Sequence, residues 1–156
     1  MWSSKEAENG DIRSQDIKIK RARFIERNNE LIQEFNFCHP KTLVHLNFVY
    51  NSHFYGSCLW NLGSEWVEKF EKSWNISMRI MLGIPRETHC YLIEPLSEQI
   101  HMKSLISSRF LGFISRIRRS KKVALRSMLK TIEYDTRSVT GGNLRKLLIQ
   151  SDEWDI

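Results

Sequence analysis

Apolar residues recur at steps of three and four through most of this chain. The clearest series are Trp66, Phe70 and Trp74 in the first half and Leu125, Met128, Leu129 and Ile132 in the second. Such steps place side chains along one side of an α-helix, whereas a half-buried strand needs apolar and polar residues in alternation. Few segments alternate in that way. The pattern therefore predicts an all-α fold, an irregular bundle of about five to seven helices with no sheet of consequence.

Proline, glycine and capping residues divide the chain into its expected helices. These helices cover about 16–37, 41–54, 64–82, 98–118, 120–134 and 144–150. Pro40 is expected to end the first helix, Gly56 to close the second and Gly83 to stop the third. Residues 87–93, ETHCYLI, fit either a helix or a strand. The TGGN sequence at 140–143 predicts a turn in which Asn143 caps the last helix.

The length of 156 residues and a hydrophobic content of 41% indicate one domain with a substantial core. We expect a polar tail over 1–14, a helical domain over 15–150 and an acidic tail over 151–156. No apolar run approaches the roughly 20 residues that span a bilayer, and residues 1–16 lack the apolar segment of a secretory signal. Three cysteines without CxxC spacing do not form a disulfide framework. We therefore expect no membrane partner and an intracellular location, in the nucleus or cytoplasm.

Positive charge is concentrated in the second half of the chain. The net charge is +6, but residues 101–150 contain 12 Lys and Arg against 2 Asp and Glu, and residues 99–132 contain no acid. On a helix over 120–134, Lys122, Arg126 and Lys130 fall at i, i+4 and i+8 and form one cationic edge. The candidate nucleic-acid-binding residues are Arg116, Arg118, Arg119, Lys121, Lys122, Arg126, Lys130, Arg137, Arg145 and Lys146.

A line of cations suits a sugar–phosphate backbone, because each neutralised phosphate releases condensed counterions. Arginine adds bidentate contacts to phosphate and can stack on exposed bases. The alternative is a solvated face that keeps a helical bundle soluble, although such faces usually mix both signs of charge. A helix lying on a membrane surface would need a free apolar face. The apolar stripe of Leu125, Met128, Leu129 and Ile132 is instead expected to face the core.

No residue cluster with catalytic or metal-binding spacing stands out. The histidines are scattered, and the Cys–His pairs at 38–39 and 89–90 are adjacent, whereas zinc ligands are usually two or more residues apart. Glu133 and Asp135, two residues apart, lie on different sides of a helix and make a poor carboxylate pair. We therefore expect no metal and no cofactor.

Two further features have a functional and a structural interpretation. TGGN could approach a phosphate closely, but it lacks the GxxxxGK pattern of a nucleotide-binding loop, so a tight turn is the better interpretation. Trp60, Trp66 and Trp74 could stack on single-stranded bases. The helical spacing of Trp66, Phe70 and Trp74 favours a place in the core.

Four strings, taken together, resemble one known family. They are KRARFIERNNELIQEF (20–35), YNSHFYGSCLWNL (50–62), EKSWNISMRIMLGIPRETHCYLIEPLS (71–97) and DTRSVTGGNLRKLL (135–148). In this order and at these distances they are similar to the segment after the polymerase core in reverse transcriptases of jockey-like non-LTR (LINE) retrotransposons. The resemblance extends over about 17–150. None of the strings is catalytic in that family.

The resemblance implies a thumb helix followed by a C-terminal helical extension, regions that hold template RNA and the primer–template duplex. It therefore implies backbone contacts to RNA or an RNA/DNA duplex, with the polymerase core of a related element as a second partner. The family's metal-binding aspartates, in a Tyr-x-Asp-Asp setting, are missing here, so we expect a non-catalytic fragment and no enzyme. Cys58 and Cys90 stand where the family pattern has Pro and Arg, which removes one candidate RNA contact. Gly63 interrupts a segment that is more helical in the family.

A second hypothesis stays open, namely a protein-interaction or structural remnant with no independent nucleic-acid binding. Its helices would expose apolar surface that once packed on the palm and thumb of a polymerase. RNA binding that weakens with salt would favour the first hypothesis. Oligomers that retain no RNA would favour the second.

Overall fold

The structure, a computed structural model, describes residues 3–51, 54–135 and 137–152. In this part of the chain it contains only helices and no strand, which confirms the predicted all-α bundle. The helices are α1 (Ser3–Glu34), α2 (Pro40–Asn51), η1 (Ser57–Leu59), α3 (Glu65–Leu82), η2 (Cys90–Leu92), α4 (Ile93–Ser97), α5 (Met102–Arg118), α6 (Val123–Tyr134) and α7 (Val139–Asp152), where η marks a 3-10 helix. None of the described helices combines the length and apolar composition that crossing a bilayer requires.

The chain divides into two compact units, so the residues expected to form one domain over 15–150 are shared between them. Unit 1 comprises Met1–Phe54 and Glu65–Met102, and unit 2 comprises Tyr55–Ser64 and Lys103–Ile156. The first helix begins at Ser3, well before Asp16, so the expected polar tail is helical over its described part. Of the expected acidic tail, 151–152 end α7 and 153–156 lie outside the described residues.

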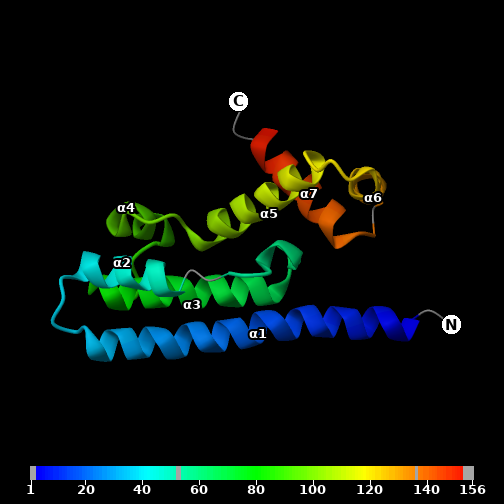
Figure 1. The fold of residues 1–156 in the computed structure, drawn as a ribbon. Coiled ribbons are helices and arrows are strands. Elements are labelled where there is room, and N and C mark those ends of the chain that lie inside the picture. The colour runs from blue at the N-terminus through cyan, green and yellow to red at the C-terminus, as the bar shows by residue number, and fades with distance from the viewer. Residues whose placement is uncertain (1–2, 52–53, 136, 153–156) are drawn as a thin grey trace. The chain divides into compact units, whose positions relative to one another are not determined.

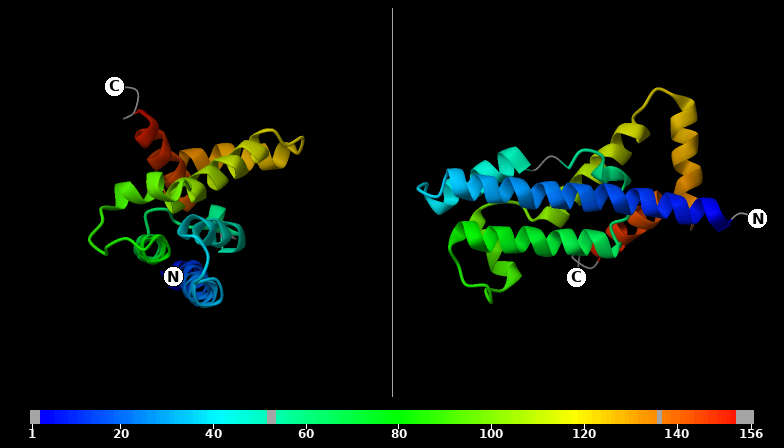
Figure 2. Two further views of the ribbon diagram at one scale, coloured as in Figure 1. Left: turned by 90° about the vertical axis from the view of Figure 1, so that its left-hand side faces the viewer. Right: turned by 90° about the horizontal axis from the view of Figure 1, so that it is seen from below.

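Unit 1 is built on two helices that lie side by side, α1 and α3, with α2 packed against both (Figures 1 and 2). The predicted apolar face of α3 is confirmed at Val67, Phe70, Trp74, Met78 and Met81, which are all buried, whereas Trp66, also expected to face the interior, is half-buried. From α1, Phe24 stacks on Trp74, with 5.2 Å between ring centroids. Phe54 meets Phe70 edge-on at 5.5 Å. This aromatic centre confirms the core interpretation of Trp74.

A seam of buried amides and hydroxyls joins the three helices of unit 1. Asn28 on α1 donates to Ser77 Oγ on α3 at 2.8 Å and accepts from Asn51 Nδ2 on α2 at 2.8 Å. The same Asn51 nitrogen donates to Asn47 Oδ1 at 2.7 Å. Buried polar groups need such partners, so the seam fixes which faces of α1, α2 and α3 meet.

Several helix boundaries differ from those expected. Pro40 is the first residue of α2, where its missing N–H leaves no hydrogen bond unmade. The second helix ends at Asn51, so Gly56 does not close it. Gly56 instead adopts φ 79° immediately before η1. Residues 87–93 contain no strand, and Pro95 lies inside the short α4, close enough to its start for proline to be tolerated. Gly83, at φ 65°, follows the end of α3 as predicted.

Unit 2 consists of α5, α6 and α7 together with the short segment that carries η1. After α5 the chain turns and runs on as α6, which lies at a steep angle to α5 (Figure 2). The core is formed by Phe110, Ile114, Leu129 and Leu144, with Phe113, Ile117 and Leu147 packed against it. Phe110 and Ile114 come from α5, and Leu129 and Leu144 from α6 and α7. The three helices therefore share one small apolar centre.

Candidate nucleic-acid interface

The structure places three of the predicted cations along one edge of α6. Lys122 precedes the helix in extended backbone, and Arg126 and Lys130 follow one and two turns later. All three side chains are exposed. Four residues advance a helix by about 6 Å and rotate it by about 40° beyond a full turn, so Arg126 and Lys130 lie on successive turns of one side of α6, and Lys122 lies just before the helix. We call Lys122, Arg126 and Lys130 the cationic line.

Four more predicted cations surround the turn between α5 and α6, and all are exposed: Arg116, Arg118, Arg119 and Lys121. Arg118 donates from Nη2 to Glu133 Oε1 at 2.7 Å and so connects the end of α5 to the last turn of α6. Within the part of the chain that the structure describes, Arg118 is the one predicted cation paired with a carboxylate. The remaining cations around this turn keep their charge available to an outside anion.

The last three predicted cations belong to the α6–α7 junction and to α7. The backbone N–H of Arg137 donates to Asp135 Oδ1 at 2.9 Å, and Arg145 Nη2 donates to the Asp135 carbonyl at 3.2 Å. The Lys146 ammonium lies against Gly63, because a Cβ added at that glycine would lie 1.9 Å from Lys146 Nζ. Arg145 and Lys146 are thus directed back onto unit 2 and do not extend the cationic line.

Three acids of unit 1 form ion pairs with lysines of the same unit. Asp16 contacts Lys20 at 3.1 Å, Glu65 contacts Lys69, and Glu98 contacts Lys41. The hydrogen bond from Lys69 lowers the pKa of the Glu65 carboxyl, and the one from Lys41 lowers the pKa of Glu98. Unit 2 has 12 Lys and Arg against 5 Asp and Glu in its sequence, a net charge of +7. The positive charge of the chain is therefore a property of unit 2.

The prediction that the apolar stripe of α6 is core is wrong for half of its members. Leu129 is 4% exposed and Ile132 is half-buried, but Leu125 is 39% and Met128 59% exposed. The reason is the narrow contact of this helix, in which Leu129 alone joins the buried cluster of unit 2. A free apolar face, whose expected absence argued against a membrane-surface helix, is therefore present in part, at Leu125 and Met128.

The predicted turn at 140–143 is also wrong, because these residues lie within α7. Gly141 lets α7 approach the end of α6, since a Cβ there would lie 2.5 Å from the Ile132 carbonyl oxygen. The Ser138 hydroxyl, 3.4 Å from the Gly141 nitrogen, accepts its N–H in the first turn, a capping role that had been expected of Asn143. TGGN is therefore a site of close helix packing.

Asn143 has a different function from the one expected. Its side chain is 2% exposed. It donates from Nδ2 to the Trp60 carbonyl at 2.7 Å, and its Oδ1 accepts from the Leu62 N–H at 3.0 Å. This amide holds the 55–64 segment to α7. Sequence reasoning missed the bridge because its two ends are about eighty residues apart.

The three tryptophans that the structure describes, Trp60, Trp66 and Trp74, offer no open platform for stacking on bases. Trp60 and Trp74 are buried in unit 2 and unit 1 respectively, which confirms the core interpretation for Trp74 and extends it to Trp60. Trp66 is half-buried, and the ammonium groups of Lys18 and Lys69 lie 4.5 Å and 4.3 Å from the centre of its ring. Cation–π contacts of this kind cover the indole face.

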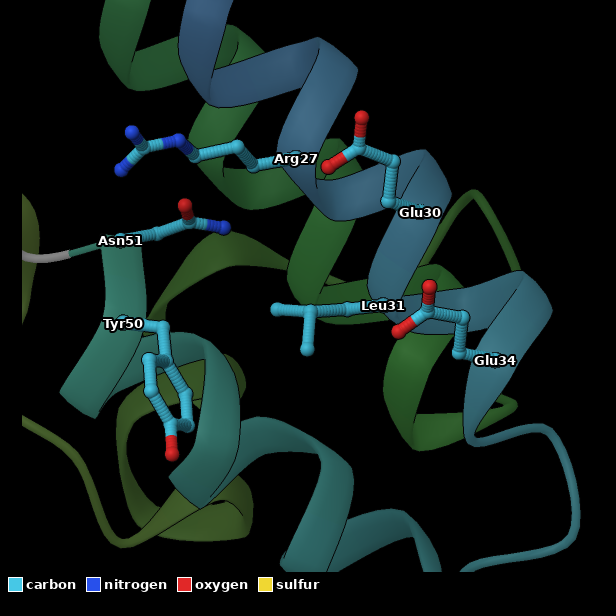
Figure 3. A pocket seen from close by; sticks show the side chains of 6 residues that line it. All are labelled: Arg27, Glu30, Leu31, Glu34, Tyr50 and Asn51. Carbon is cyan, nitrogen blue, oxygen red and sulfur yellow. The ribbon is translucent and has the colours of Figure 1, made fainter.

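Unit 1 contains a groove between α1 and α2 that sequence reasoning did not identify (Figure 3). Its volume is about 340 Å³, and its lining consists of Arg27, Glu30, Leu31, Glu34, Tyr50 and Asn51. The charged side chains are of both signs, and the Asn51 amide nitrogen is used in the seam between helices. No group of His, Cys, Asp and Glu that could hold a metal occurs among the residues the structure describes. The groove lacks the single-signed charge of the cationic line.

Comparison of the chain with protein-family models, with curated proteins and with solved structures found no match. An interpretation of its function therefore depends on the geometry and charge of its own residues. Among these features, the cationic line combines exposed side chains with charge of one sign.

Proposed function

We propose that this chain is a non-catalytic helical module that binds the sugar–phosphate backbone of RNA, alone or paired with DNA, through unit 2. The observation that carries the proposal is the row of three exposed cations on one edge of α6, without a carboxylate partner among the described side chains. Four residues of α6 advance about 6 Å along the helix axis, so a strand that follows this edge can meet more than one of the cations. Each phosphate neutralised by this row releases counterions, which drives binding without reading sequence.

The surrounding residues support this assignment. Arg116, Arg119 and Lys121 add exposed charge beside the start of the line. The resemblance to the thumb and C-terminal extension of LINE-type reverse transcriptases favours the same partner, because those regions hold RNA and its duplex with DNA. We place the protein inside the cell, in the nucleus or cytoplasm, which is consistent with three free cysteines. The proposal assigns the chain no reaction.

Replacing Lys122, Arg126 and Lys130 together with alanine tests the proposal. Three lost phosphate contacts should weaken RNA binding about 100-fold at 0.1 M salt, since each is worth roughly 0.7 logarithmic units there. All three side chains are exposed, so the fold should be retained. Filter binding with a labelled RNA measures the affinity, and circular dichroism checks the helix content.

The matched control removes the same charge from unit 1, by changing the exposed residues Arg23, Arg27 and Lys72 to alanine. If net charge alone mattered, both triple variants would lose affinity equally. The proposal requires a large loss in the α6 variant and a small one in the control. Equal losses, or none in either, would contradict it.

A second function is favoured by a specific observation, the exposed apolar flank of α6. Leu125 and Met128 are exposed there, and Ile149 is exposed on α7. Uncovered apolar side chains of this kind mark a surface that another protein can cover. Full RNA affinity in the α6 triple variant, together with self-association in sedimentation velocity, would favour this protein-interaction function over RNA binding.

A further inference from the structure

An exposed tyrosine continues the cationic line at its C-terminal end. Tyr134 follows Lys130 by four residues, as Lys130 follows Arg126. It is the last residue of α6, and its side chain is 86% exposed. The edge of α6 therefore presents cations over two turns and then an aromatic ring on the same line.

The acidic neighbours of Tyr134 are engaged within unit 2. Glu133 accepts from Arg118 at 2.7 Å. Asp135 accepts from the Arg137 backbone N–H through its carboxylate, and its carbonyl accepts from Arg145 at 3.2 Å. Both acidic residues therefore have partners within unit 2. An approaching strand thus meets the ring beside positive charge.

A phosphate chain seated on the cationic line would carry its bases along the same edge. In a single strand the bases are free to rotate outward and stack on an aromatic side chain. In a duplex they are paired and stacked inside, where a ring at the end of a surface helix cannot reach a base face. The combination of a linear row of cations with one terminal ring therefore distinguishes single strands from duplexes.

We propose that unit 2 selects single-stranded RNA, with Tyr134 stacking on one unpaired base while the cationic line holds the adjoining phosphates. This inference rests on the proposed function, because it specifies the form of nucleic acid bound at the same site. Tyr134 supplies the preference for single strands, and the cations supply affinity common to both forms.

The test compares Tyr134→Leu and Tyr134→Phe with the unchanged protein, using a 12-nucleotide single-stranded RNA and the duplex of the same sequence. Tyr134→Leu should weaken binding to the single strand about tenfold, which is the typical loss of one stacked base. The affinity for the duplex and the slope of affinity against salt should be unchanged. Tyr134→Phe should bind both forms as the unchanged protein does. Tyr91→Leu, at an exposed tyrosine of unit 1, is the control.

A single-stranded RNA containing 2-aminopurine gives a second readout, because the fluorescence of this base falls when it stacks. Quenching by the unchanged protein and by Tyr134→Phe, and its loss in Tyr134→Leu, is the expected result. Equal affinity of Tyr134→Leu and the unchanged protein for the single strand would overturn the stacking role while the backbone function stands. Equal loss on both forms would overturn it too. Failure of the unchanged protein to bind either form would overturn both proposals together.

Discussion

Replacing Gly141 with alanine is expected to destabilise unit 2 by about 3 kcal/mol, the upper range for forcing extra atoms into a packed contact. The added Cβ would lie 2.5 Å from the Ile132 carbonyl oxygen and 3.0 Å from that of Asp135. Both are backbone atoms at the end of α6, so no rotamer change can relieve the clash. The two helices must move apart, and the cluster around Leu129 and Leu144 must open.

The neighbouring glycine supplies the control. A Cβ at Gly142 would meet nothing within 4 Å, and alanine is the better helix former, so Gly142→Ala should stabilise the protein by about 0.5–1 kcal/mol. Urea unfolding followed by circular dichroism measures both changes. Gly141→Ala should therefore lower the free energy of unfolding, whereas the adjacent Gly142→Ala should raise it. A gain, or no change, for Gly141→Ala would contradict the described contact between α6 and α7.

Replacing Asn143 with leucine is expected to cost about 3 kcal/mol, because one buried and one part-buried backbone group each lose a partner worth about 1–3 kcal/mol. The groups are the Trp60 carbonyl and the Leu62 N–H. The variant should also release the 55–64 segment. Hydrogen exchange at the Leu62 amide measures this directly, and exchange should become faster by a hundredfold or more, as a loss of about 3 kcal/mol implies.

Asn61→Ala is the control for the Asn143 variant. Asn61 lies in the same segment, but its side chain is exposed and only accepts from the Gly63 N–H at 3.0 Å. Its loss should cost less than about 1 kcal/mol, because water replaces the missing acceptor. If the Leu62 amide stayed protected from hydrogen exchange in Asn143→Leu, the Asn143 side chain would not be what holds the 55–64 segment to α7.

The buried face of α3 was predictable because the spacing of its own apolar residues places them on one side of the helix. Val67, Phe70 and Trp74 recur at the steps of one helical side, and long neighbours, α1 and α2, are present to cover them. For α6 the same kind of spacing correctly predicted a helix but not its burial. Spacing shows that a helix has an apolar side, whereas coverage of Leu125 and Met128 depends on other elements that a local pattern does not contain.

The TGGN sequence shows how a distant contact overrides local preference. Glycine and asparagine favour turns when nothing else is known. Here Gly141 is required by the closeness of α6, and Asn143 by two backbone groups near Trp60. Both reasons concern residues outside the local window. The predicted turn was therefore wrong even though each residue was correctly recognised as special.

Part of the candidate site could be predicted from the sequence. The spacing of Lys122, Arg126 and Lys130 predicted one row on a helix; Arg126 and Lys130 lie on α6 as expected, whereas Lys122 immediately precedes it in extended backbone. Tyr134 continues the same four-residue spacing, so the sequence alone could have added it to the candidate site. The pairing of Arg118 with Glu133 could not, because it depends on how α5 and α6 meet. What the row binds stays a prediction.

The dependence of RNA affinity on salt tests the central claim most directly. The measurement is the association constant of the unchanged protein for a single-stranded RNA between 50 and 200 mM salt. If about five phosphates are neutralised by unit 2, the logarithm of that constant should fall with a slope of roughly −3 to −4, a loss of about 100-fold over this range. A slope shallower than about −1, or the absence of binding at 50 mM salt, would contradict the account.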